Sequence, residues 1–365
     1  MSNGSKLFQP VQVGPITLRH RVVLAPSTLP SPIMAEYYGQ RARAKGTLLI
    51  AEPAFIAPKA GGFIHVPGIW SDEQIAGWKQ VTDAVHARGS YVFLQLWALG
   101  RTAYPEYLGP GEYVSASAAT AHLPFHGGSA LRSTSETARE LSVEEIAEYV
   151  QLYAQAASNA VHKAGFDGVE VHGANGYLPE QFLADNINQR TDAYGGSVEN
   201  RARFVFEVID GIAAAIGAPR TAIRLSPWSK LQGCVFEDPK ATYTCVVQGL
   251  RDRHPDLGYI HVIEDYYKTQ GGSNDFIREI WGERPLISAG GYSQHPELGF
   301  RVAEEKGDIV AFSKAFIANP DLPCRLFHGK TLLEGDSSRY YTYGTDDPTG
   351  YTDYQASTYA VSAAA

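Results

Sequence analysis

Short apolar segments alternate with amphipathic segments along most of this chain. Each apolar segment is four to six residues long and leads into a polar loop, which is typical of a strand buried on both faces of a sheet. The eight predicted strands are residues 21–25, 47–51, 91–96, 168–171, 222–225, 259–263, 285–288 and 308–312.

Segments with the period of an amphipathic helix follow these strands. We predict helices over residues 33–45, 71–88, 142–163, 200–216, 241–252, 274–281, 295–306 and 322–328. Ser71 is the expected N-cap of the second helix, and Ser142-Val143-Glu144-Glu145 reads as a capping box at the start of the third. The third helix should end before Gly165 and the fourth before Gly217.

Eight strand–helix units predict an α/β fold, a single-domain (β/α)8 TIM barrel spanning residues 1–365, with its core at about 7–330. The alternative is an open, doubly wound sheet. That fold usually carries a glycine-rich phosphate loop after its first strand, where this chain has Ala25-Pro26-Ser27-Thr28-Leu29-Pro30, so we favour the barrel. The insertion after the third strand is expected to form a lid, and residues 331–365 a pocket wall and tail.

Composition and charge exclude some classes of binding partner. The 365 residues carry a net charge of −8 and no run of Lys and Arg, which argues against nucleic acid or an anionic membrane as a partner. The sequence shows neither a secretion signal nor a membrane-spanning segment, and Cys234, Cys245 and Cys324 read as reduced thiols. We therefore expect a cytoplasmic monomer or homodimer that acts on a small molecule.

The segment from Gly168 to Tyr177 carries the clearest candidate chemistry. An apolar strand ends in His172, Asn175 and Tyr177, whose side chains would converge above the end of a parallel strand. Imidazole and carboxamide can donate hydrogen bonds to a carbonyl oxygen, and a phenol can supply a proton. The alternative reading is a polar loop in which the His and Tyr satisfy each other.

Other candidate residues, many of them polar, aromatic or cationic, fall at the same end of the predicted strands, where barrels place their chemistry. They are Thr28, Pro53, Gln95 with Trp97, Arg224, Glu264, Gly290-Gly291 and Ser313-Lys314, whereas the strands themselves are almost wholly apolar. A glycine pair beside a lysine at the last two strands indicates a phosphate site.

We expect no metal site. His122 and His126 have a spacing that could bind a metal on a helix, but the proline and glycines around them argue against one. An exposed lid is the better interpretation of this segment.

Several motifs of this chain resemble those of the old yellow enzymes, and most closely those of the fungal branch. They include Leu7-Phe8-Gln9-Pro10, Glu36-Tyr37-Tyr38, Gln95-Leu96-Trp97, Gly165-Phe166-Asp167-Gly168-Val169-Glu170-Val171-His172, Asn188-Gln189-Arg190-Thr191-Asp192 and Asn319-Pro320-Asp321-Leu322. The resemblance covers nearly the whole chain.

The resemblance implies a barrel that holds FMN at its mouth and reduces activated C=C bonds of small enones or enals with NADPH. Tyr177 would be the proton donor, and His172 and Asn175 would hold the substrate carbonyl. Thr28, Gln95 and Arg224 would contact the flavin, and Gly290, Gly291, Ser313 and Lys314 its phosphate. Trp97 and Tyr341 would shape the substrate pocket. A role in fungal secondary metabolism is expected.

The chain departs from this family on the flavin side. Pro53 stands where the family usually has Gly or Ala with an N–H for the flavin, and Ser313-Lys314 replaces a Gly-Arg pair. The loops 27–33 and 264–270 are also short. These departures leave two further hypotheses open. One is a flavin-independent isomerase or cyclase that uses Tyr177 and His172 as acid and base, and the other is a ligand-binding protein without catalysis.

Overall fold

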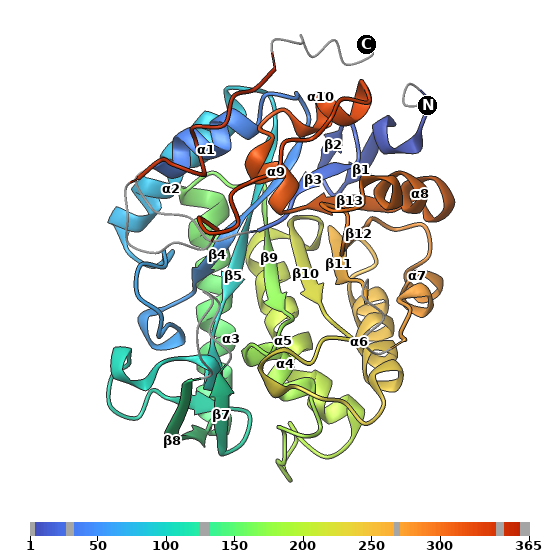
Figure 1. Cartoon of the computed structure of the whole chain (residues 1–365). Coiled ribbons are helices and arrows are strands. Elements are labelled where there is room, and N and C mark those ends of the chain that lie inside the picture. The colour runs from blue at the N-terminus through green and yellow to red at the C-terminus, as the bar shows by residue number, and fades with distance from the viewer. Residues whose placement is uncertain (1–3, 27–32, 124–131, 266–270, 341–346, 358–365) are drawn as a thin grey trace.

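Eight parallel strands close into a barrel that helices surround, as Figure 1 shows for the computed structural model. The structure describes residues 4–26, 33–123, 132–265, 271–340 and 347–357. Strand order is β3-β4-β5-β9-β10-β11-β12-β13, with β13 pairing back onto β3. The strands are β3 (Val22–Leu24), β4 (Leu48–Phe55), β5 (Tyr91–Trp97), β9 (Gly168–Gly173), β10 (Thr221–Leu225), β11 (Tyr259–Ile263), β12 (Leu286–Ala289) and β13 (Ile309–Phe312). The predicted (β/α)8 barrel is confirmed.

The predicted helices are all present, with shifted ends. They are α1 (Met34–Arg41), α2 (Asp72–His86), α3 (Val143–Ser158), α5 (Val198–Ile216), α6 (Pro239–Arg253), α7 (Asp275–Trp281), α8 (Pro296–Lys306) and α10 (Leu322–Phe327). Two short helices were not predicted, α4 (Leu178–Leu183) and α9 (Lys314–Ala318), because one turn or two show no clear period. No helix in the described ranges is both long and apolar enough to cross a bilayer.

The predicted capping box opens α3. The Ser142 hydroxyl accepts from the Glu145 N–H at 3.2 Å, and the Glu145 carboxylate accepts from the Ser142 N–H at 2.8 Å. The helix then passes into a π-helical turn over Asn159–Lys163 instead of continuing as α-helix to residue 163. There the buried Asn159 amide donates to the Ile69 carbonyl at 2.9 Å.

Replacing the cap should lower stability measurably. Ser142→Ala leaves the first-turn N–H groups of α3 without their side-chain acceptor, so we expect a loss of about 1 kcal/mol in the free energy of unfolding. Urea denaturation followed by circular dichroism measures this loss. Gln151→Ala, on the exposed face of the same helix, should change little, and an equal loss in both variants would contradict the capping argument.

One strand departs from its prediction at the pocket. The second barrel strand, expected to end at residue 51, runs to Phe55, and its register against β5 shifts between Ala51 and Pro53. Because proline has no N–H to give to a ladder, a bulge at this point is the expected consequence. Pro53 therefore lies inside β4, and not in the loop after it.

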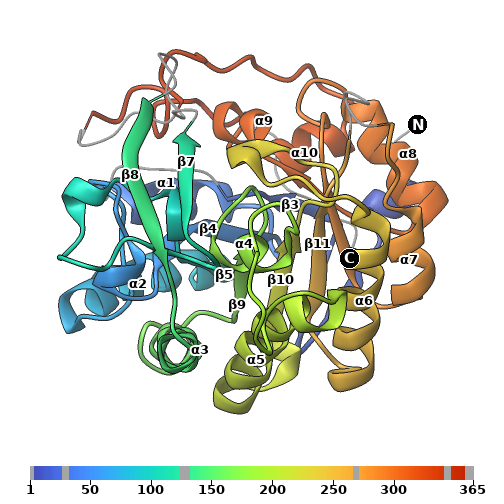
Figure 2. The same ribbon diagram turned by 90° about the horizontal axis from the view of Figure 1, so that it is seen from below.

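Two small sheets flank the barrel. The hairpin of β1 (Val11–Val13) and β2 (Ile16–Leu18) packs Val13, Ile16 and Leu18 against the barrel interior. The insertion after β5, expected as a lid, forms a three-stranded sheet of β6 (Val114–Ser115), β7 (Ala119–Leu123) and β8 (Arg132–Glu140), which Figure 2 shows to one side of the barrel. His122 belongs to β7, opposite Ser133, and His126 lies outside the described residues.

Candidate active site

A cavity of about 350 Å³ opens at the carboxyl ends of the barrel strands. It gathers most residues that the sequence singled out: Pro53, Gln95, Trp97, His172, Asn175, Tyr177, Arg224, Gly290, Gly291, Ser313 and Lys314. Thr28 and Tyr341 lie outside the described residues. Glu264, expected at the same rim, does not line the cavity; its carboxylate pairs with Arg278 at 2.5 Å.

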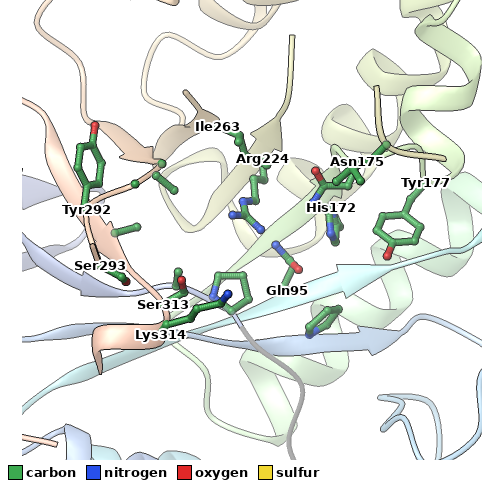
Figure 3. Close-up of a pocket in the computed structure, with 18 of the residues that line it drawn as sticks. Gln95, His172, Asn175, Tyr177, Arg224, Ile263, Tyr292, Ser293, Ser313 and Lys314 are labelled. Atoms are coloured by element: carbon green, nitrogen blue, oxygen red, sulfur yellow. The ribbon is translucent and has the colours of Figure 1, made fainter. Parts of the chain in front are cut away.

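The cavity has two ends with different chemistry, as Figure 3 shows. Ser313 and Lys314 lie at one end, and His172 and Tyr177 lie at the other, with Gln95 between them. The residues predicted to hold a phosphate and those predicted to hold a carbonyl are thus separated along one pocket.

Aromatic packing fixes the side chains at the His172 and Tyr177 end of the cavity. His172 is the last side chain of β9 before Gly173, and Tyr177 is the N-cap of α4. The two rings lie edge to face with centroids 4.6 Å apart, and the Trp97 ring stands perpendicular to Tyr177 at 4.8 Å. All three side chains are at least 95% buried, so their orientations are set by packing.

Asn175 occupies the turn between β9 and α4. Its backbone has φ 59°, in the left-handed region that asparagine tolerates better than most residues. Figure 3 places its side chain next to His172, so the carboxamide and the imidazole border the same part of the cavity.

A polar layer inside the barrel supports the middle of the cavity. Gln95 donates to the Glu170 carboxylate at 2.6 Å, and the His261 ring contacts the other carboxylate oxygen at 2.9 Å. Burial opposes the charge of Glu170, but His261, Arg224 and Gln95 outweigh it and hold the pKa of this carboxyl below its usual value. Glu170 is therefore an anion that orients the Gln95 amide and balances Arg224.

The expectation of almost wholly apolar strands is therefore wrong for the barrel interior. Gln95, Glu170, Arg224 and His261 all sit within strands, and register pairs Gln95 with Glu170 and Arg224 with His261. The sequence does show single polar residues within these apolar segments. It does not show that their side chains contact one another inside the barrel.

A glycine pair and a lysine also border the cavity, after the last two barrel strands. Gly290 and Gly291 have φ of 149° and 72°, and a Cβ on Gly290 would meet the Glu264 Cβ at 3.0 Å, so glycine is required there. Lys314 is exposed, begins α9 and places its ammonium 5.8 Å from the Tyr340 ring centroid. This lysine can neutralise a phosphate at the mouth of the cavity.

The donor set fits a flat, anionic heteroaromatic cofactor such as a flavin nucleotide. Of the described residues that line the cavity, none is Asp or Glu, whereas Arg224 and Lys314 both reach it. The buried Gln95 Oε1 has no hydrogen-bond donor within the described part of the chain and is available to a ligand N–H. Pro53 offers no N–H, which removes one contact, worth about 1 kcal/mol.

Sequence reasoning missed several lining residues. Phe63, Leu231 and Tyr292 also border the cavity, and the Phe63 ring lies 5.6 Å from Trp97. Phe63 and Leu231 come from loops with no periodic pattern, so nothing in the sequence pointed to them. Tyr292 follows the Gly290-Gly291 pair and could have been read from that position.

Known proteins similar to this chain include a flavin oxidoreductase family and two fungal reductases or oxidoreductases. Residues 6–332 match the family described as NADH:flavin oxidoreductase / NADH oxidase. The chain is 44% identical to the chanoclavine-I aldehyde reductase fgaOx3 of Penicillium roqueforti, covering 96% of each chain. It is 43% identical to the NADP-dependent oxidoreductase lnbE of Aspergillus flavus, covering 98% of each.

Two further matches bear on fold and activity. A protein of Epichloe festucae var. lolii named probable inactive reductase easA is 40% identical over 96% of this chain and 95% of its own. The crystal structure of Old Yellow Enzyme from Pichia sp. AKU4542 superposes with a TM-score of 0.85 at 33% identity, covering 98% of this chain and 95% of that one.

Proposed function

Given that this chain belongs to the NADH:flavin oxidoreductase / NADH oxidase family, which includes the old yellow enzymes, we propose that it is an ene-reductase for a small α,β-unsaturated aldehyde or ketone. One observation carries the proposal: His172, Asn175 and Tyr177 border one cavity that also holds Arg224 and Lys314 and no carboxylate among its described lining residues. The names of two fungal relatives, an aldehyde reductase and an NADP-dependent oxidoreductase, support an enal substrate and NADPH as reductant.

In this proposal Gln95 and Arg224 would hold the ring system of FMN, and the glycine pair 290–291 with Ser313 and Lys314 would hold its phosphate. When bound, FMN supplies the hydride for the substrate carbon β to the carbonyl. Glu170, by keeping its negative charge, fixes the Gln95 amide so that its free oxygen faces the ligand.

His172 and Asn175 bind the carbonyl oxygen of the substrate. Negative charge develops on that oxygen as the C=C bond is reduced, and two preset donors stabilise the charge more than they stabilise the ground state. Trp97 packs against the reacting end and excludes water from it.

Tyr177 delivers the proton to the α-carbon. A phenol is a weak acid, so it transfers its proton only when enolate charge lies beside it, which couples protonation to the preceding step. Its ring packs edge to face against both Trp97 and His172, so the hydroxyl needs no reorientation at that moment.

A flavin-independent isomerase or cyclase is the second candidate. Pro53 removes a backbone donor from the flavin side, and the Epichloe relative bears the name of a probable inactive reductase. In this case Tyr177 and His172 would act as acid and base on the same carbonyl compound, with no change of oxidation state. Product formed without NADPH would identify this reaction.

The first experiment is reconstitution with FMN. After incubation and desalting, we expect the oxidised-flavin absorption band at near-stoichiometric level, together with NADPH oxidation that depends on added enal. Absence of the band after reconstitution would reject the ene-reductase proposal in favour of the redox-neutral one.

Lys314 should contribute to cofactor retention. Lys314→Met removes the cation from the phosphate end, and we expect FMN to bind about tenfold more weakly, as for one lost charge-assisted contact. Lys314→Arg should restore or improve binding, measured by flavin fluorescence on titration. Lys240→Met, an exposed lysine on α6, is the control, and an unchanged affinity in Lys314→Met would contradict this assignment.

A further inference from the structure

The turn that carries Asn175 has an unusual backbone. Asn175 and Gly176 both lie in the left-handed region, with φ of 59° and 82°. A Cβ at Gly176 would come within 2.3 Å of the Gln232 Cβ, so no other residue fits. Two successive left-handed residues need outside support to hold one conformation.

A buried carboxylate supplies that support from behind the cavity. The Gly176 N–H donates to Glu180 Oε2, while the Ser226 and Tyr243 hydroxyls donate to Glu180 Oε1 at 2.6 Å and 2.7 Å. The Asn175 N–H donates to Ser226 Oγ at 2.8 Å. Both amides of the turn therefore end on Glu180, one directly and one through Ser226.

This cluster is separate from the cavity that it supports. Glu180 on α4 is 1% exposed and Ser226, directly after β10, is fully buried, and neither lines the cavity. Tyr243 reaches them from α6. Three elements thus meet at one carboxylate, which fixes where the turn stands relative to β10.

We propose that Glu180 is a positioning residue, whose carboxylate holds the 175–176 turn and thereby sets the direction of the Asn175 amide and the Tyr177 hydroxyl. The inference deepens the proposed function and rests on it for the roles of Asn175 and Tyr177. Glu180 touches neither substrate nor cofactor in this arrangement.

The protonation state of Glu180 gives a test that a merely structural residue would fail. Burial raises the pKa of Glu180 to about 7, against its three hydrogen-bond donors. Tyr243 and Cys234 also face it, and burial raises the pKa of both, that of Cys234 to about 12; Arg101 lies beside Cys234. Of these groups, only Glu180 changes charge near neutral pH. Once protonated, Glu180 loses its negative charge and part of its acceptor capacity, so the hydrogen bonds that hold the turn weaken.

The affinity for a phenolate ligand tests the position of the 175–176 turn without requiring catalysis. On the FMN-loaded protein, 4-nitrophenolate should dock its oxygen on His172 and Asn175, and its absorbance reports the bound anion. Glu180→Gln should weaken this binding about tenfold at pH 8, the size of one displaced charge-assisted hydrogen bond, with flavin content unchanged. Glu207→Gln, which removes a similar Tyr–Glu contact on α5, should bind as the parent does.

The dissociation constant of Glu180→Gln for 4-nitrophenolate, divided by that of the parent, should fall toward one as the pH is lowered through about 7. Protonated Glu180 in the parent then resembles Gln. The ratio cancels the ligand's own titration. Ser226→Ala keeps the carboxylate but cuts the link to Asn175, so severalfold weaker binding is expected even if Glu180→Gln does not fold.

Parent-like phenolate binding in Glu180→Gln, or in Ser226→Ala if the first variant does not fold, would overturn the inference. So would a ratio independent of pH. A parent protein that binds phenolate yet reduces no enal would reject the proposed function, while this test of Glu180 still stands.

Discussion

Tyr177→Phe should lower the rate of enal reduction about a hundredfold or more, the usual contribution of a positioned general acid. The phenylalanine ring keeps the packing against Trp97 and His172, at 4.8 Å and 4.6 Å in the parent, so only the hydroxyl is lost. Steady-state kinetics with an enal and NADPH measure the effect. Because carbonyl binding depends on other residues, KM and phenolate affinity should change little.

The matched control is Tyr113→Phe. Tyr113 belongs to the same buried aromatic cluster as Trp97 and Tyr177, but its hydroxyl donates to the Arg101 carbonyl at 2.9 Å and does not border the cavity. It should lose stability without a comparable loss of rate. If Tyr177→Phe retained the parent rate, the proton would have to come from water, and the assignment of Tyr177 would be wrong.

The barrel could be predicted because its signal is local and repeated. Strands buried on both faces are short apolar segments whatever their neighbours, and Ser71 and Ser142 mark helix starts by side-chain chemistry alone. The resemblance to the old yellow enzymes, read from motifs, is confirmed by the family match and by the relatives in fungi. Where prediction missed, as at β4 beyond residue 51, a proline bulge hid the continuation of the strand.

The cavity residues could be predicted because parallel strands end on one side. His172 ends strand β9, and Asn175 and Tyr177 follow it directly, so their closeness in sequence forces closeness in space. The Glu180 cluster could not be found in this way, since Ser226 and Tyr243 reach it from chain positions 46 and 63 residues away. Contacts of that kind depend on the packing of α4, β10 and α6, which no periodicity encodes.

The same distinction explains the polar layer. Glu170 and His261 are 91 residues apart and meet only because β9, β10 and β11 are neighbours in the closed barrel. In the proposed function this carboxylate under the cavity would act through Gln95 and Arg224, which the motifs had already indicated. Sequence thus supplied the residues at the rim, and the structure supplied the groups that orient them.

Asn175→Asp should reduce enal turnover by about three orders of magnitude at pH 8. Loss of one preset donor to a developing oxyanion costs about 10²–10³ in rate, and the new carboxylate adds repulsion. Aspartate is nearly isosteric and tolerates a left-handed backbone, so the turn with φ 59° and its bond to Ser226 should survive. Binding of 4-nitrophenolate should weaken in parallel, because the same donor holds its oxygen.

Acid pH provides the internal control for this variant. A protonated aspartic acid is neutral and can donate, so the deficit relative to the parent should shrink as the pH falls toward the range in which an aspartate titrates. A deficit independent of pH would point to a disturbed turn and not to a lost donor. Parent-like phenolate binding in Asn175→Asp would show that the carbonyl is held elsewhere, and His172 would then have to carry the oxyanion alone.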